Sequence, residues 1–222
     1  MINTLYLFII VAVSYFIGAL PTAYLIARFI HKVNIFDIGS GNMGGTNVAR
    51  VAGLHWGVIT ILIDAAKGMM AVYFAQQLMP TYVLSASMLA AVWAIIGHNW
   101  SLIASLLYRH YRGEFKVIGG KGAATAFGTM VMLFPPEAII LLLITGIGLA
   151  VITRYASLSV LVSFTVALTW ATGWAILNGD TTGDTVIYLV YILSIVILIL
   201  WRFRENITRL LHGTERRLGE RV

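Results

Sequence analysis

The chain has 222 residues, of which 59% are apolar and only 11% are charged. Soluble domains average about 45–50% apolar and about 25% charged residues, so this composition indicates an integral membrane protein without a large soluble domain. The absence of cysteine excludes disulfides, cysteine metal sites and a cysteine nucleophile. The net charge of +6 indicates basic cytoplasmic loops in a protein with several spans, and we expect no nucleic-acid partner.

Seven apolar segments are candidates for transmembrane helices, judged against the roughly 20 residues that cross a bilayer. The segments are 4–27, 57–79, 82–107, 122–134, 137–153, 158–177 and 185–201. The fourth is short and rich in Gly and Ala, so it is tilted, broken or completed by the loop before it. A six-span alternative merges the fourth and fifth into one re-entrant pair. We predict an all-α, polytopic membrane protein with seven transmembrane helices, forming a single domain over residues 1–222.

Lysine and arginine set the expected orientation. If the N-terminus lies outside and the chain crosses seven times, the cytoplasmic segments hold 14 of the 15 basic residues, all except Lys67. These segments are 28–56, 108–121, 154–157 and 202–222. The asymmetry follows the positive-inside rule. We therefore expect a cytoplasmic, basic C-terminal tail and a first span that is retained rather than cleaved as a signal peptide.

Two glycine-rich stretches fall on the expected cytoplasmic side: GSGNMGGTNVAR at 39–50 and GGKGAAT at 119–125. Glycine lets backbone N–H groups approach an anion closely, and successive N–H groups can form an anion-binding nest. Both stretches run into apolar helices, whose positive N-terminal ends would point at the same anion. Arg50 and Lys121 add one positive charge each. The two stretches therefore predict binding of two anionic groups, which we interpret as phosphates.

Other interpretations of these glycines fit less well. GSGNMG matches G-x-G-x-x-G, and Asp64 lies 20 residues beyond Gly44, but a membrane helix follows instead of a βαβ unit. GGKG lacks the Ser or Thr that follows the lysine of a P-loop. Helix packing accounts for Gly146 and Gly148. It does not account for the loop glycines, which alternate with Ser40, Asn42, Thr46 and Asn47.

A few polar residues lie within or at the ends of apolar spans. Asp64 and Lys67 are three residues apart and so share a helix face. Intramembrane charges are costly, and a structural ion pair, a substrate contact and a site-orienting role are all open. His98 ends an apolar run, either as a helix-packing partner or as a site residue. The other histidines are scattered without ligand spacing, so the sequence predicts no metal site and no cofactor; they are His31, His55, His110 and His212.

Six motifs occur in order along the chain: GSGNMGGTNVAR, D-x-x-K-G at 64–68, GHNW at 97–100, GGKGAAT, RYASLS at 154–159 and RENITRLLHGTE at 204–215. Together they resemble the bacterial acyl-phosphate:glycerol-3-phosphate acyltransferases, the PlsY family. The resemblance covers nearly the whole chain. It implies a seven-helix protein of the bacterial cell membrane with a cytoplasmic active site. The implied reaction moves a fatty acyl group from acyl phosphate to the 1-hydroxyl of glycerol 3-phosphate, giving lysophosphatidic acid and phosphate, with an acyl-phosphate-forming enzyme as a partner.

The resemblance also implies roles for particular residues. The implied catalytic residues are Ser40, Arg50, Lys121, Ser157 and Asn206. The implied substrate-binding residues are Gly41, Asn42, Thr46, Asn47, His98, Gly119, Gly120, Gly122 and Glu205. Arg50 and Lys121 would neutralise phosphates, and Glu205 would orient its loop. Since acyl phosphate is a mixed anhydride with a good leaving group, no covalent intermediate is required, and the substrate's own phosphate can serve as the general base.

The chain departs from the family pattern at three places. Gly45 stands where the family usually has alanine. The segment after GHNW is longer, and its extra basic residues predict a lid or a headgroup-binding loop over 101–118. Phe203 replaces a family histidine thought to contact glycerol 3-phosphate, and phenylalanine neither donates a hydrogen bond nor carries charge. A divergent paralogue with another acceptor or donor therefore stays open, as does a non-catalytic organic-phosphate transporter or partner subunit, although polar residues gathered at one face disfavour transport.

Overall fold

The computed structural model describes residues 4–39, 41–178 and 182–219. Its regular elements are helices, and the described residues form two compact units. The N-terminal unit runs to Thr129 and the C-terminal unit begins at Met130, so the boundary falls inside helix α7 (Ala123–Leu133). The assignment of the chain to a single domain stays a prediction.

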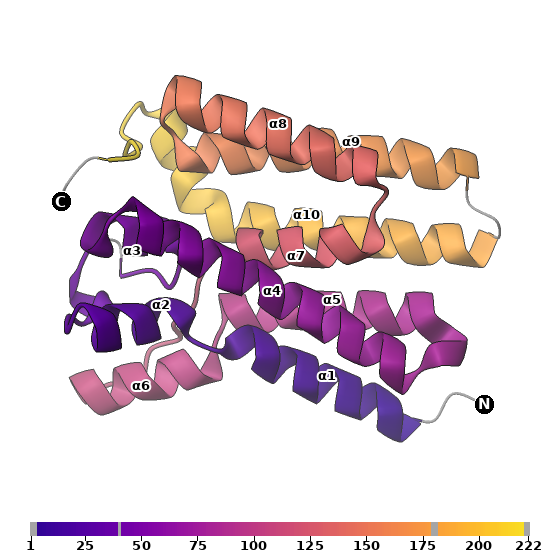
Figure 1. Cartoon of the computed structure of the whole chain (residues 1–222), viewed down its shortest axis with the longest axis horizontal. Helices are drawn as coiled ribbons and strands as arrows, with labels where there is room; N and C mark the ends of the chain where they lie inside the picture. The colour runs from indigo at the N-terminus through magenta and orange to yellow at the C-terminus, as the bar shows by residue number, and fades with distance from the viewer. Residues whose placement is uncertain (1–3, 40, 179–181, 220–222) are drawn as a thin grey trace. The chain divides into compact units, whose positions relative to one another are not determined.

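The N-terminal unit is built on three long helices that pack against one another, α1, α4 and α5 (Figure 1). Shorter helical elements gather around the ends of these three. In chain order the elements are α1 (Thr4–Ala19), α2 (Thr22–Leu25), η1 (Ile26–Ile30), η2 (Ile35–Asp37), α3 (Gly45–Ala52), α4 (Leu54–Leu78), η3 (Pro80–Tyr82), α5 (Val83–Asn99) and α6 (Leu102–Arg112).

Glycines allow the helices of this unit to pack closely. A Cβ on Gly18 of α1 would overlap the backbone of Ala94 in α5, and a Cβ on Gly97 of α5 would overlap the backbone of Tyr15. Gly128 of α7 meets the backbone of Ala65 in α4 in the same way. In lipid, helices associate through such close packing because burial of apolar surface drives them together less than in water. These contacts fix the helix ends on which the polar loops rest.

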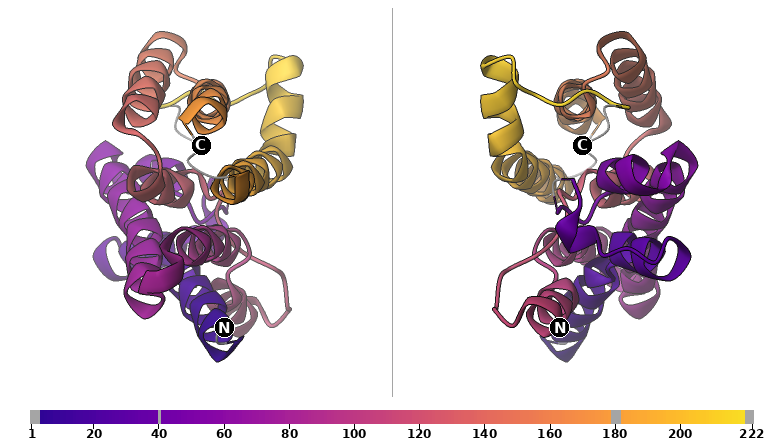
Figure 2. Two further views of the ribbon diagram at one scale, coloured as in Figure 1. Left: turned by 90° about the vertical axis from the view of Figure 1, so that its right-hand side faces the viewer. Right: turned by 90° about the vertical axis from the view of Figure 1, so that its left-hand side faces the viewer.

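The C-terminal unit contains α8 (Pro136–Thr153), α9 (Ala156–Asn178) and α10 (Thr182–Leu211), with α9 packed against both of the others. Figure 2 shows that the last turns of α10, in yellow, bend away from the rest of that helix and toward the connection between α8 and α9. This bend carries the last motif of the chain to the start of α9.

Six helices in the described residues are long and apolar enough to cross a membrane. They are Thr4–Ile30, Leu54–Leu78, Pro80–Asn99, Pro136–Thr153, Ala156–Asn178 and Gly183–Leu211. The remaining predicted span, 122–134, corresponds to α7, whose 11 residues extend about 16 Å against a hydrocarbon core of about 30 Å. Seven crossings and the orientation of the termini stay predictions.

One predicted boundary was wrong, and two other predicted segments show detail that the sequence did not predict. The predicted span 82–107 ends at Asn99, because Ser101 caps a separate helix by accepting a hydrogen bond from the backbone of Ala104 at 3.0 Å. The first span is interrupted after Ala19 by Leu20 and Pro21, since proline cannot continue the helical hydrogen-bond pattern. The tail expected from residue 202 is helical as far as Leu211.

Candidate active site

The first glycine stretch folds back onto the helix that follows it. Gly39 and Gly41 have φ angles of +63° and +65°, in the left-handed region that favours glycine. Asn47 donates from Nδ2 to the carbonyl of Ile38 at 3.1 Å, and a Cβ on Gly39 would overlap the Asn47 side chain. The buried Asn47 therefore shapes the loop from inside. Ser40, predicted as catalytic, lies outside the described residues.

Only part of the stretch 39–50 is a loop, which corrects the sequence prediction. Gly44 is the N-cap residue of α3, which runs from Gly45 to Ala52 and packs against α4. Thr46 and Asn47 therefore lie in the first turn of this helix and Arg50 in its last turn. The N–H groups at the start of a helix favour an anion. In this stretch the N–H groups of Gly41, Met43 and Asn47 already donate to the carbonyls of Ile38, Gly119 and Gly44, and Asn42 lies between the first two.

The second glycine stretch lies against the end of α5. The N–H of Gly120 donates to the carbonyl of His98 at 2.9 Å. A Cβ on Gly119 would overlap the backbone carbonyl of Asn99, and a Cβ on Gly120 would overlap the His98 ring. Gly122 has a φ of +75° and leads directly into α7. His98 therefore supports this loop by packing, while Lys121 between the glycines is half-exposed.

The two glycine stretches are neighbours in the N-terminal unit. The N–H of Met43 donates to the carbonyl of Gly119 at 3.4 Å. Each stretch ends at the start of a helix, α3 in one case and α7 in the other. The structure thus joins two predicted anion-binding loops that are far apart in sequence.

Asp64 and Lys67 of α4 form a buried ion pair, with Lys67 Nζ 2.7 Å from Asp64 Oδ1. The same ammonium donates to the carbonyls of Leu20 at 2.7 Å and Gly18 at 3.4 Å, where α1 ends. His98 Nδ1 lies 3.9 Å from Asp64 Oδ1. Of the three alternatives left open by the sequence, the structural ion pair is therefore present, and it connects the end of α1 to the histidine that supports the second loop.

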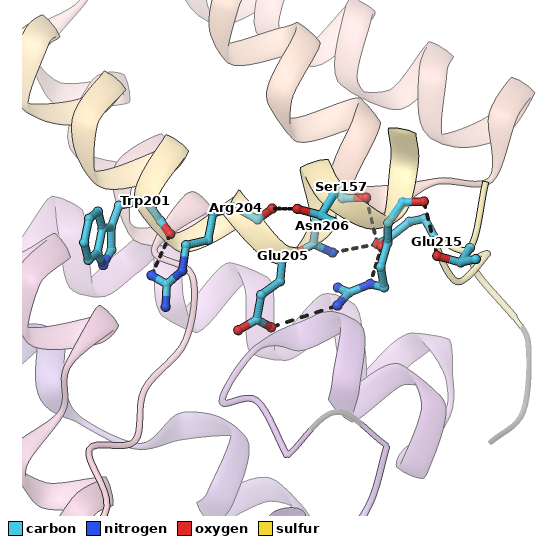
Figure 3. A network of polar contacts seen from close by, with 9 residues as sticks. Ser157, Trp201, Arg204, Glu205, Asn206 and Glu215 are labelled. Atoms are coloured by element: carbon cyan, nitrogen blue, oxygen red, sulfur yellow. Dashed lines mark hydrogen bonds and ion pairs between the residues drawn. The ribbon is translucent and has the colours of Figure 1, made fainter. Parts of the chain in front are cut away.

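In the C-terminal unit, three side chains converge on the carboxylate of Glu215 (Figure 3). Ser157 Oγ and Asn206 Nδ2 both donate to Oε1, at 2.8 and 2.6 Å. Arg209 Nε donates to Oε2 at 2.7 Å. Ser157 and Asn206 are buried. Two of the predicted catalytic residues are thus held together by a third residue to which the sequence had assigned no role.

The turn after α10 explains how Glu215 reaches this position. Gly213 has a φ of +68° and donates to the carbonyl of Leu210, while the N–H of Thr214 donates to the carbonyl of Arg209. This is the Schellman pattern, which reverses the chain at a helix end. The chain then runs back alongside α10, so Glu215 faces the side chains of Asn206 and Arg209.

Two further contacts hold the segment after this turn. Leu218 exchanges hydrogen bonds with Arg154: its N–H donates to the Arg154 carbonyl at 2.6 Å, and Arg154 Nη2 donates to the Leu218 carbonyl at 2.8 Å. Arg154 itself has a φ of +61°, unusual for a residue with a side chain. Arg217 lies over the ring of Tyr155. These contacts fasten residues 217–218 to the connection between α8 and α9.

Glu215 is ionised at neutral pH despite its partial burial. Burial by itself would raise the pKa of this carboxyl. The hydrogen bonds from Arg209, Asn206 and Ser157 stabilise the charged form more strongly, and the pKa lies below its ordinary value of 4.5. The cluster is therefore a negative centre neutralised by one arginine.

Two other residues of the last motif lie apart from this cluster. Glu205 is on α10, not in a loop, and its side chain is 74% exposed, 3.9 Å from Arg209 Nη1. Phe203 is buried. Arg204 donates to the carbonyl of Trp201 at 3.3 Å and lies over the Trp201 ring, so its guanidinium is directed toward that residue.

A crevice of about 230 Å³ lies between α9 and α10. It begins at Leu161, one helical turn beyond Ser157, and continues to Thr172; its other wall includes Ile192 and Leu200. Thr165 and Thr172 donate their hydroxyls to carbonyls of their own helix at 2.8 Å. Their hydrogen-bonding capacity is thus used within the helix, and the crevice offers an apolar surface.

The sequence and fold were compared with those of known proteins. A model of the family described as glycerol-3-phosphate acyltransferase matches residues 8–213. The chain belongs to the glycerol-3-phosphate acyltransferase family. A glycerol-3-phosphate acyltransferase of Halalkalibacterium halodurans is 39% identical over 208 residues, which are 94% of this chain and 93% of that protein. The family and the helices together make this an integral membrane acyltransferase of lipid biosynthesis.

Two solved structures of the family have a similar fold. Both are crystal structures of PlsY (YgiH), an integral membrane glycerol 3-phosphate acyltransferase. The glycerol 3-phosphate form has a TM-score of 0.75 and 26% identity, and covers 96% of each chain. The lysophosphatidic acid form has a TM-score of 0.71 and 27% identity, and covers 96% of this chain and 95% of the other. The resemblance to this family found in the motifs is thereby confirmed.

Sequence reasoning about this acyltransferase missed Glu215 and Arg209. Both lie within the last recognised motif, and both bear charges next to the predicted residue Asn206. Gly213 was the available signal, because a glycine just past a helix turns the chain back on itself. A carboxylate two residues after such a turn is placed to meet donors on the preceding helical turns.

Proposed function

We propose that this protein transfers a fatty acyl group from acyl phosphate to the 1-hydroxyl of glycerol 3-phosphate, releasing lysophosphatidic acid and inorganic phosphate. The observation that carries the proposal is the junction of the two glycine loops, each leading into a helix and each accompanied by one cationic residue, Arg50 or Lys121. Both proposed substrates carry a phosphate group. Family membership supports glycerol 3-phosphate as the acceptor.

The proposed chemistry needs positioning more than a nucleophile. The hydroxyl oxygen of glycerol 3-phosphate attacks the carbonyl carbon of acyl phosphate, a carbon–oxygen ester bond forms, and the bond between that carbon and the phosphate oxygen breaks. The phosphate leaves with the electron pair, and the hydroxyl proton passes to a substrate phosphate oxygen. Backbone N–H groups and cations stabilise the negative charge on the reacting groups, and holding both substrates in place removes much of the entropic barrier.

Each predicted residue receives a role in this proposal. Arg50 and Lys121 neutralise phosphate. The backbone of the two glycine stretches supplies N–H donors, and Asn47 and His98 keep those stretches in shape through the contacts given above. Ser157 and Asn206 seat glycerol 3-phosphate in the C-terminal unit. Other proposed phosphate or substrate contacts come from Ser40, Gly41, Asn42, Thr46, Gly119, Gly120, Gly122 and Glu205.

The acyl chain of the donor calls for an apolar surface. The crevice between α9 and α10 supplies one that starts a single helical turn from Ser157, and we assign it to the acyl chain. We also propose that the polar loops face the cytoplasm, where the basic residues predict them to be, and that a soluble or membrane-bound enzyme forming acyl phosphate supplies the donor.

The direct test supplies purified protein with labelled glycerol 3-phosphate and either palmitoyl phosphate or palmitoyl-CoA. We expect labelled lysophosphatidic acid from palmitoyl phosphate and none from palmitoyl-CoA. Product from palmitoyl-CoA alone would overturn the proposed donor. No product from either donor, with Phe203→His also inactive, would overturn the proposed reaction.

Phe203 favours one alternative, a family member that uses another acceptor. Its buried ring cannot bond to a phosphate or hydroxyl as histidine would. If this alternative holds, wild-type protein should acylate a different hydroxyl compound, and Phe203→His should raise activity toward glycerol 3-phosphate. If Phe203→His instead lowers that activity, the ring is part of the native site for glycerol 3-phosphate.

A further inference from the structure

Helix α6 holds the segment that enters the second glycine stretch. Ser105 Oγ accepts a hydrogen bond from the N–H of Ile118 at 2.9 Å and donates to the carbonyl of Ser101 at 2.7 Å. Ser101 N–H in turn donates to the carbonyl of Ile118 at 2.9 Å. Ser101 and Ser105 are buried, and Ile118 immediately precedes Gly119. The start of α6 therefore fixes the residue from which the second stretch begins.

The far end of the same helix holds the segment that enters the first glycine stretch. Tyr111 donates its hydroxyl proton to Asp37 Oδ2 at 2.6 Å, and Arg112 forms an ion pair with Asp37 Oδ1. The hydrogen bond to Asp37 raises the pKa of Tyr111 above its ordinary value of 10.0, so this tyrosine keeps its proton at neutral pH. Asp37 lies two residues before Gly39.

An aromatic cluster reinforces this contact. The centroid of the Phe36 ring lies 5.2 Å from the ring centroid of Tyr108 and 6.2 Å from that of Tyr111, both on α6. It lies 5.5 Å from the ring centroid of Tyr24 on α2. Aromatic pairs at such distances attract beyond the burial of their area. Phe36 and Asp37 thus attach the entry to the first stretch to α6 by both apolar and charged contacts.

We propose that α6 is a brace that holds the two glycine stretches in register, and that Asp37 is the positioning residue that attaches the first stretch to this helix. The brace replaces the lid or headgroup-binding loop that the sequence had suggested for 101–118. The two stretches share the hydrogen bond from Met43 to Gly119, and each entry segment is anchored to a different end of one rigid helix. Only the expected change in KM rests on the proposed function; the structural role of α6 does not.

The expected consequence is weaker substrate binding when the contact between Asp37 and α6 is lost. If the two stretches are correctly placed for only a fraction of the time, the apparent Kd for a phosphate substrate is the intrinsic Kd divided by that fraction. The chemical step, which follows binding, is expected to change little. A change in KM with a nearly constant kcat therefore distinguishes positioning from loss of folded protein, which would lower kcat per mole of enzyme.

The test compares Asp37→Asn and Tyr111→Phe with Arg109→Gln, a matched control on the same helix whose side chain is exposed and makes no contact with Asp37 in the described residues. For Asp37→Asn we expect KM for glycerol 3-phosphate to rise by about three- to tenfold and kcat to stay within about twofold. Asp37→Glu should recover part of the loss. The control should match the wild type.

A second measurement does not depend on the reaction. Amide hydrogen exchange at Met43 reports the bond between the two stretches, since its N–H is protected only while that bond is made. We expect faster exchange there in Asp37→Asn and unchanged exchange in Arg109→Gln. Unchanged exchange together with unchanged KM would overturn the brace. An inactive wild type would count against the proposed function, and the exchange result would still decide on the brace.

Discussion

The two polar regions of this protein are built in opposite ways. In the N-terminal unit, the glycine stretches are shaped by close packing. A side chain on a glycine of the second stretch would strike His98 or Asn99, and one on Gly39 of the first would strike Asn47. In the C-terminal unit, Ser157 and Asn206 are held by the ionised side chain of Glu215. The first region should therefore be sensitive to added volume and the second to removed charge.

The largest effect should come from the buried ion pair between Asp64 and Lys67. Lys67→Met would leave Asp64 buried without its partner and the carbonyl of Leu20 without its donor. Breaking a buried pair in this way costs about 3–5 kcal/mol. The measurement is thermal unfolding in detergent. The double variant Asp64→Asn with Lys67→Met should be more stable than Lys67→Met, and a double variant that is less stable would show that Asp64 does not depend on Lys67.

Added volume in the second glycine stretch should have the next largest effect. A methyl group on residue 119 would strike the backbone oxygen of Asn99, which cannot move aside as a side chain can. For Gly119→Ala we expect about 2–3 kcal/mol of destabilisation, in the upper part of the range for overpacking, and a higher KM for phosphate substrates. Gly148→Ala is the control because no atom lies within 4 Å of its added Cβ. Equal responses in the two variants would contradict the steric argument.

That control also corrects a prediction. The sequence attributed both Gly146 and Gly148 to helix packing, but only Gly146 has a close neighbour, Ser163.

Removed charge should affect the C-terminal cluster by a smaller amount. Glu215→Gln keeps an acceptor oxygen for Ser157 and Asn206 but loses the charge that faces Arg209. We expect a loss of about 1.5–2 kcal/mol in stability, at the lower end for a hydrogen bond with a charged partner. Glu205→Gln, in the same motif but at an exposed side chain, should change stability by less than about 0.5 kcal/mol. If Glu205→Gln has the larger effect, the carboxylate that organises this region has been misidentified.

The stability conferred by Glu215 should depend on pH in a defined direction. Its pKa is lower in the folded protein than the ordinary value of 4.5. The ionised form therefore stabilises the fold above that ordinary value, and the contribution is lost as pH falls through the folded pKa. Unfolding temperatures of the wild type and Glu215→Gln, measured from pH 7 to pH 3, should differ at neutral pH and converge in acid. A constant difference would mean that the charge of Glu215 does not contribute.

The sequence could predict what depends on composition and local pattern. Apolar runs located the helices, and glycines alternating with small polar residues located the loops that Met43 and Gly119 join. It could not predict where a helix ends inside an apolar run, as at Asn99, because the cap at Ser101 is a matter of local hydrogen bonding. Nor could it pair Asp37 with Tyr111 or Glu215 with Ser157, since these contacts depend on long-range packing.

The smallest effect should come from a substitution that fills part of the apolar crevice between α9 and α10. Thr169 lines this crevice, and Thr169→Phe would fill part of it without touching either polar region. If the acyl chain lies there, the ratio of kcat/KM for palmitoyl phosphate to that for lauroyl phosphate should fall by about two- to tenfold, within the range for a few methylenes in an apolar pocket. Leu193→Phe, on an exposed part of α10 outside the crevice, is the matched control. A shift in chain-length preference with Leu193→Phe and none with Thr169→Phe would place the acyl chain on another surface of the protein. The contrast between the two polar regions would still hold, because neither substitution touches them.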